Sequence, residues 1–163
     1  MSIEKVRAYF RALGREGDIL EFPVSSATVE LAAQAVGVIP ARIAKTLSFL
    51  VDGGCVLIVA AGDAKIDNGK FKGFFHTKAK MLTPEQAVEM TGHAVGGVCP
   101  FANPEGVRTY LDVSLKRFDT VFPAAGSSNS AIQLTCDELA EYSHSQGWVD
   151  VCKGWQEEPA SAG

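Results

Sequence analysis

The stretch KTLSFLVDGGCVLIVAA, residues 45–61, decides the fold of this chain. Its two arms, residues 45–51 and 55–61, are apolar and partly β-branched, a pattern typical of strands in the centre of a sheet. The residues between them, Asp52, Gly53 and Gly54, are those that tight turns favour. The stretch therefore predicts a central β-hairpin.

Helices are predicted on both sides of this hairpin. Near the N-terminus, apolar residues recur at helical spacing and a capping glycine follows them: Ile3, Val6, Phe10, Leu13 and Gly14. The alanine-rich residues 28–36 end at Gly37 and predict a second helix, and Pro40 can begin a short third one. Two later helices begin at capping-box sequences, one at Thr83 and one at Thr135.

Further strands are expected at residues 19–22, 107–111, 120–124, 131–134 and 149–151. The order of helices and strands is irregular and includes a hairpin, which a doubly wound parallel sheet does not explain. We therefore expect an α/β protein of the mixed α+β type, with a mixed, mostly antiparallel sheet flanked by helices.

Length and composition indicate one domain over residues 1–155, followed by a flexible tail at residues 156–163. A chain of 163 residues buries roughly 70% of its unfolded surface, which is enough for a core without disulfides or metal. No apolar stretch approaches the roughly 18 residues of a membrane span. The N-terminus lacks the layout of a secretion signal, so we expect a cytoplasmic protein.

The four cysteines, Cys55, Cys99, Cys136 and Cys152, are widely separated in the sequence. They form no C-x-x-C pair and have no histidine at metal-ligand spacing, so neither a structural zinc site nor another cofactor is expected. In a cytoplasmic chain they are expected to be reduced thiols.

Three segments carry a family resemblance: Lys45-Thr46-Leu47, the loop from Gly96 to Phe101, and the Gly126-Ser127 step after an apolar strand. In this order and at these separations they resemble the YbaK family of aminoacyl-tRNA deacylases. The same module is the editing domain inserted in bacterial prolyl-tRNA synthetases. The resemblance covers residues 24–151 and implies hydrolysis of the ester of a small amino acid, namely Cys, Ala, Ser or Thr, mischarged on tRNA.

The resemblance also implies site residues. The catalytic set is Lys45, Gly96 and Gly97, and the substrate-binding set is Thr46, Val98, Cys99, Pro100, Phe101, Gly126 and Ser127. Glycines let the main chain approach a ligand closely, and Pro100 fixes the turn, so backbone amides of this loop can bind the substrate's carbonyl oxygen. Catalysis by way of the substrate's own ribose hydroxyl, which the family suggests, agrees with the lack of a Ser-His-Asp signature.

The implied partners are mischarged tRNA, with tRNA(Pro) as the expected species, and prolyl-tRNA synthetase or other translation factors; neither DNA nor a membrane is expected. The formal net charge is −4, but residues 65–80 carry five lysines against one aspartate, a sum of +4 that leaves −8 elsewhere. The lysines predicted to bind tRNA are Lys65, Lys70, Lys72, Lys78 and Lys80. The aromatic residues among them, Phe71, Phe74, Phe75 and His76, can stack on an unpaired base or merely anchor the segment to the core.

Other functions stay open at this point. Cys99 with His93 or His76 could form a thiol nucleophile and base, although Pro100 directly after the cysteine argues against a helix that would activate it. The glycine loop could be a tight connection without a ligand, and Lys45 could simply reach from a strand end to solvent. The domain could also bind tRNA ends or a synthetase without turnover.

Overall fold

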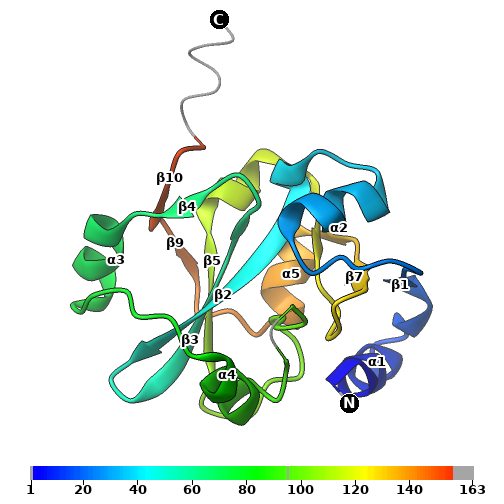
Figure 1. Ribbon diagram of the computed structural model, residues 1–163, viewed down its shortest axis with the longest axis horizontal. Coiled ribbons are helices and arrows are strands. Elements are labelled where there is room, and N and C mark those ends of the chain that lie inside the picture. Colours follow the sequence, from blue (N-terminus) through cyan, green and yellow to red (C-terminus); the bar gives the residue numbers. More distant parts are fainter. Residues whose placement is uncertain (1, 95, 156–163) are drawn as a thin grey trace, which may run out of the picture.

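The computed structural model describes residues 2–94 and 96–155. A six-stranded sheet runs through the molecule in the order β8-β6-β2-β3-β5-β9 (Figure 1). Its strands are β2 (Ile43–Val51), β3 (Gly54–Ala61), β5 (Arg108–Asp112), β6 (Thr120–Pro123), β8 (Leu134–Thr135) and β9 (Trp148–Val149). Two small sheets pair β1 (Ile19–Glu21) with β7 (Ser130–Ile132), and β4 (Lys65–Ile66) with β10 (Cys152–Lys153).

The predicted mixed sheet is confirmed. Among the described residues, the pairs β1–β7, β4–β10, β2–β3 and β6–β8 are antiparallel, and the pairs β2–β6, β3–β5 and β5–β9 are parallel. When all three sheets of the described residues are taken together, antiparallel pairs outnumber parallel ones. Within the six-stranded sheet parallel pairs prevail, because β5, β6 and β9 all enter it through crossovers rather than hairpins.

The central hairpin forms as predicted. β2 and β3 pair from Ala44–Ala61 to Val51–Gly54. The turn residues Asp52 and Gly53 have φ angles of 53° and 78°, the two positive values that a type I′ turn requires. The side chains of β3 from Cys55 onwards are buried, so the hairpin lies in the core, as its continuous apolar sequence indicates.

Within the described residues, five α-helices surround the sheets: α1 (Ser2–Ala12), α2 (Val29–Val36), α3 (Asn68–Phe75), α4 (Pro84–Thr91) and α5 (Cys136–Tyr142). Short 3-10 helices form at η1 (Glu16–Asp18), η2 (Pro40–Arg42) and η3 (Val113–Arg117). Both predicted capping boxes are present, at Thr83 with Gln86 and at Thr135 with Glu138. Each box satisfies backbone donors that a helix start leaves without a partner.

Aromatic contacts hold α3 against the sheet, and α1 against α5 and the loop that carries residue 101. Phe71 of α3 packs against Phe49 of β2 at a ring distance of 4.9 Å. Phe10 of α1 contacts the ring of Phe101 at 4.9 Å and that of Tyr142 in α5 at 5.8 Å. Figure 1 shows α3 at one side of the sheet, and α1, α2 and α5 at the other.

The prediction of a single strand over residues 131–134 is wrong, because two short strands form there. Ile132 pairs with Ile19 in the small β1–β7 sheet, whereas Leu134 pairs with Val121 of β6. The exposed Gln133 lies between them. The chain changes partners there because both apolar neighbours are fully buried, each against a different strand.

Residues 156–163, predicted to form a flexible tail, lie outside the described residues. In the part of the chain that is described, none of the helices has the length and apolar character needed to cross a membrane.

Candidate functional site

A pocket of about 250 Å³ opens beside β2. β2 pairs with β6 through Ile43 and Ala44, and the segment at residues 80–82 bonds to it from Ser48 onwards. Residues 45–47 lie between these two contacts and line the pocket. The site is therefore an opening along one edge of a central strand.

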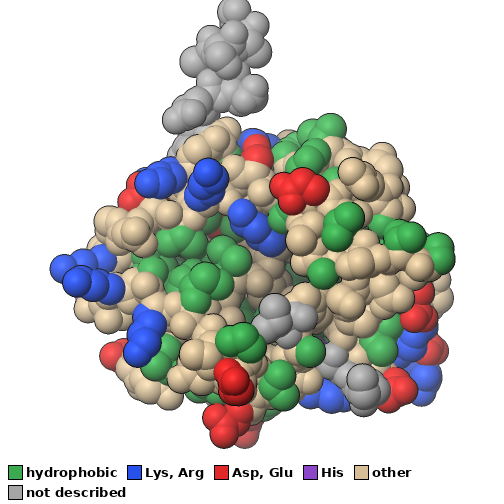
Figure 2. Space-filling view, in the orientation of Figure 1, with side chains coloured by type: hydrophobic (Ala, Val, Ile, Leu, Met, Phe, Trp, Pro, Cys, Tyr) green, Lys and Arg blue, Asp and Glu red, His purple; other side chains and the backbone are tan. Residues whose placement is uncertain are grey.

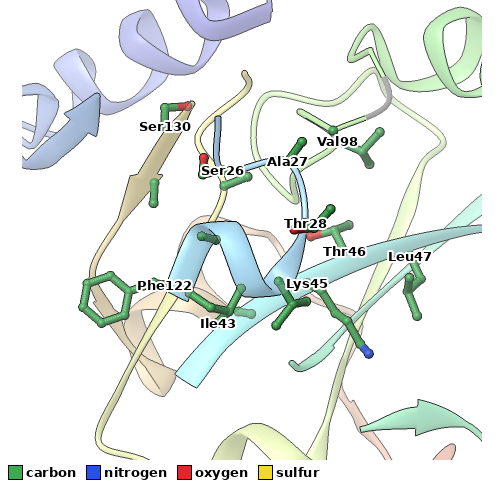
Figure 3. Close-up of a pocket in the computed structure, with 16 residues that line it drawn as sticks. Ser26, Ala27, Thr28, Ile43, Lys45, Thr46, Leu47, Val98, Phe122 and Ser130 are labelled. Carbon is green, nitrogen blue, oxygen red and sulfur yellow. The ribbon is translucent and has the colours of Figure 1, made fainter. Parts of the chain in front are cut away.

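Three other segments complete the wall (Figure 3). They are residues 26–29 at the start of α2, the loop that carries Gly96 and Val98, and the β6 to β7 region with Phe122, Ala124, Ser130 and Ala131. The start of α2 is tied to the β6 to β7 connection by the Ser26 N–H, which donates to the Ser128 carbonyl at 2.6 Å. Most lining side chains are small.

The two predicted glycine segments meet in the structure. A Cβ atom on Gly97 would lie 2.9 Å from Ser127 Cα, a separation that real Cβ atoms essentially never show, and 3.1 Å from the Gly126 carbonyl carbon. The neighbouring Gly96 has a φ of 94°, a left-handed conformation that suits glycine. Only glycine at position 97 lets the two loops approach this closely.

The amide of Gly97 is already occupied, because its N–H donates to the Ala94 carbonyl at 2.9 Å. Gly97 is thus placed to shape the loop, whereas Gly96 and Val98 are the loop residues that line the pocket. Ser127 is not a lining residue; its hydroxyl bonds to that of Ser130 at 2.7 Å, and Ser130 lines the pocket.

Lys45 lines the pocket with its stem, but its ammonium group is directed elsewhere. Nζ donates to the Ala64 carbonyl and lies 3.4 Å from the Gly62 carbonyl. In Figure 3 the side chain extends away from the loop that carries Val98. Burial lowers the pKa of this ammonium. Two of its three donors are used by carbonyls, which leaves one for a ligand.

Thr46 points to the other side of β2, as alternation along a strand requires. Its Oγ1 atom is buried and has no hydrogen-bond partner within the described residues, and the residue lines the pocket. A buried hydroxyl without a partner carries a desolvation penalty that a bound ligand can remove.

Five predicted substrate contacts are not among the residues that line this pocket: Cys99, Pro100, Phe101, Gly126 and Ser127. Cys99 and Phe101 are fully buried in the core. Pro100 is also buried and borders a separate hollow beside Tyr9. The 99–101 segment anchors the glycine loop to the core, because the side chains of Cys99 and Phe101 pack there.

The alternative thiol site is present as a contact but unsuited to catalysis. Cys99 Sγ lies 3.6 Å from His93 Nε2, and both side chains are fully buried. Burial raises the pKa of Cys99 to about 12 and lowers the pKa of His93. Both groups are therefore neutral, and a substrate has no route to the thiol. His76 lies elsewhere, at the C-cap of α3.

The five predicted tRNA-binding lysines lie on α3 and its flanks. Lys70 is engaged, since its Nζ bonds to Asp150 at 3.0 Å and to the Cys152 carbonyl at 3.2 Å. Lys72 and Lys78 border one hollow, and Lys65 and Lys80 are exposed. No ion pair within the described part of the chain involves these last four.

Sequence reasoning missed much of the pocket: Ser26, Ala27, Thr28, Ala32, Phe122 and Ser130. They are common residue types without motif spacing, and no motif in the sequence marked them. Within residues 2–94 and 96–155 no three His, Cys, Asp or Glu side chains cluster as metal ligands.

Known proteins match this chain closely. YwhH of Bacillus subtilis (strain 168), an uncharacterized protein, is 57% identical over 157 residues, covering 96% of this chain and 100% of its own. A proline–tRNA ligase of Leuconostoc citreum (strain KM20) is 31% identical over 127 residues, 71% of this chain but 22% of the ligase. A crystal structure of a candidate trans-editing enzyme for prolyl tRNA synthetase superposes with a TM-score of 0.84 at 30% identity, covering 94% of this chain and 98% of that one.

The model of the aminoacyl-tRNA editing domain family matches residues 24–142. This range contains all the pocket segments described above. The resemblance seen in the sequence is thereby confirmed, and the chain belongs to the aminoacyl-tRNA editing domain family.

Proposed function

We propose that this protein is a free-standing deacylase that hydrolyses the ester of a small amino acid mischarged on tRNA. The observation that carries the proposal is the small pocket beside the glycine loop. At about 250 Å³ it is smaller than the roughly 300 to 1,000 Å³ of sites that enclose whole drug-sized ligands. It suits a small side chain and its ester, with the rest of the tRNA outside.

The pocket wall consists mainly of small side chains and includes hydroxyl groups. Alanines at positions 27, 32, 44, 124 and 131 line the pocket together with Ser26 and Ser130. A synthetase distinguishes side chains that differ by one methylene by only about 1 to 3 kcal/mol, so a second site is needed to remove errors. Cys, Ala, Ser and Thr are the proposed substrates, and the hydroxyls of Thr46 and Ser130 give the pocket a polar side for them.

The proposed chemistry needs positioning rather than a strong nucleophile. Water attacks the ester carbonyl carbon, the bond from that carbon to the ribose oxygen breaks, and the ribose oxygen gains a proton. The neighbouring ribose hydroxyl orients the water. The amides of Gly96 and Val98 are the proposed donors to the carbonyl oxygen as it becomes negative, while Gly97 holds the loop in place.

Lys45 would keep this opening in shape through the carbonyls of the 62–64 turn and offer its remaining donor to the substrate. Lysines on α3 and its flanks would contact tRNA phosphates. We propose tRNA(Pro) as the substrate, charged in error by prolyl-tRNA synthetase, which would place the enzyme in the cytoplasm.

A panel of tRNAs tests the proposal. tRNA(Pro) mischarged with Ala, Cys, Ser or Thr is incubated with the purified protein, and correctly charged Pro-tRNA(Pro) is the control. Loss of one or more mischarged esters with Pro-tRNA(Pro) preserved is the expected result. Binding without hydrolysis of any of them would contradict it and make the protein a binding module.

A further inference from the structure

A row of apolar side chains crosses three neighbouring strands and begins at the pocket. Leu47 of β2 pairs with Ile58 of β3, and Ile58 pairs with Tyr110 of β5. Residues directly opposite one another on adjacent strands point to the same face. Leu47 also lines the pocket, so the row leads from the pocket across the sheet.

Helix α3 extends this row with one exposed ring. Phe74 is 48% exposed, and its ring lies 5.6 Å from that of Tyr110 in an edge-to-face arrangement. Phe71 and Phe75, its neighbours on the helix, are buried. The basic segment contains three phenylalanines, and of these three only Phe74 has a ring that a ligand can reach. We refer to Leu47, Tyr110 and Phe74 as the aromatic platform.

Basic residues lie on the elements that carry the platform and next to them. Lys72, two residues before Phe74 on α3, points to the opposite side of that helix and borders a hollow with Lys78. Arg108, two residues before Tyr110 in β5, points to the same side of the sheet. Among the described residues, none of these three basic side chains takes part in an ion pair. Figure 2 shows hydrophobic side chains gathered between α3 and the sheet, with lysine or arginine side chains around them.

We propose that the aromatic platform binds the terminal base of a single-stranded RNA 3′ end while its ester occupies the pocket. This inference rests on the proposed function. An exposed ring with basic residues on the same and adjacent elements matches a nucleobase and its phosphates, since single-stranded RNA is bound by stacking on aromatic side chains combined with basic groups. A purely apolar partner would gain nothing from the cations.

Binding of a short RNA tests the platform without catalysis. The probe is the ribonucleotide ACCA with 2-aminopurine in place of its terminal adenine, whose fluorescence falls when the base stacks. Phe74→Ala should weaken binding about tenfold and abolish the quenching. Phe74→Leu, which keeps apolar packing but lacks a ring, should behave like Phe74→Ala, and Phe74→Trp should retain binding.

The matched control is Val88→Ala, which truncates another exposed apolar residue, 51% exposed, on α4. It should bind the probe as the wild type does. Equal affinity and equal quenching in Phe74→Ala and Val88→Ala would overturn the platform.

Hydrolysis of mischarged tRNA, measured separately, keeps the two proposals apart. If the wild type hydrolyses the ester and Phe74→Ala does so with unchanged kcat/KM, the platform is refuted and the deacylase stands. If the wild type hydrolyses no ester but binds the probe with quenching, and Phe74→Ala loses that quenching, the platform stands and the deacylase is refuted.

Discussion

Gly97 lies against the backbone of Ser127 so closely that a Cβ atom on Gly97 would come within 2.9 Å of Ser127 Cα. This contact joins two segments that are thirty residues apart in the sequence. It also fixes the position of the adjacent Gly96 and Val98, which line the pocket. The shape of the site therefore depends on glycine, which has no side chain, at position 97.

Replacing Gly97 with alanine should separate the two loops. Overpacking of this kind costs about 1 to 3 kcal/mol of stability, and we expect deacylation to fall by about a hundredfold because the oxyanion donors move. Thermal unfolding and single-turnover hydrolysis measure the two effects. Gly17→Ala, where a Cβ meets nothing within 4 Å, is the control. Full activity in Gly97→Ala would show that the contact is not needed.

Lys45→Ala should reduce deacylation by about a hundredfold or more, since it removes both a donor to the substrate and the bonds to the 62–64 carbonyls. Lys153→Ala, at an exposed lysine of β10, should leave the rate unchanged. Rates are measured with the mischarged tRNA that the wild type prefers. Wild-type kcat/KM in Lys45→Ala would exclude any role of this ammonium.

Thr46→Val should separate stability from activity. The buried Oγ1 has no partner in the described chain, so removing it should stabilise the free protein by about 1 kcal/mol. If the hydroxyl bonds to the substrate, KM should rise in the same variant. Urea unfolding and steady-state kinetics provide the two readings, and an unchanged KM would place the substrate away from Thr46.

Cys99→Ala should retain most of the deacylase activity. The thiol is buried and its pKa is raised to about 12, so it does not form the thiolate that a nucleophile requires. The small cavity should lower stability by about 1 kcal/mol. Hydrolysis assays on Cys99→Ala and Cys99→Ser check this, and near-complete loss in both folded variants would favour covalent catalysis.

Acid should destabilise the protein through His93. Its folded-state pKa is lowered by burial, whereas the unfolded value is about 6.5. The neutral imidazole thus contributes stability that is complete above about pH 6.5 and is lost as the pH falls through the folded-state pKa. Urea midpoints between pH 8 and pH 5 should fall more steeply for the wild type than for His93→Gln. Parallel curves would assign the acid sensitivity to other groups.

Local sequence determined the hairpin and the helix starts. Asp52-Gly53 adopts the positive φ angles of its turn, and Thr83 and Thr135 cap their helices, because these effects involve residues that are near one another in the chain. The sequence also identified the three segments of the family motif, since their order along the chain is itself the signal.

Tertiary structure decided which of those motif residues face the pocket. Gly96 and Val98 line it, whereas Cys99 and Phe101 in the same motif turn into the core. The direction of the Lys45 ammonium was likewise set by carbonyls at positions 62 and 64. Side-chain orientation and burial depend on neighbours that come from distant parts of the chain. A sequence motif can therefore indicate where a site lies, but tertiary packing determines which atoms line it.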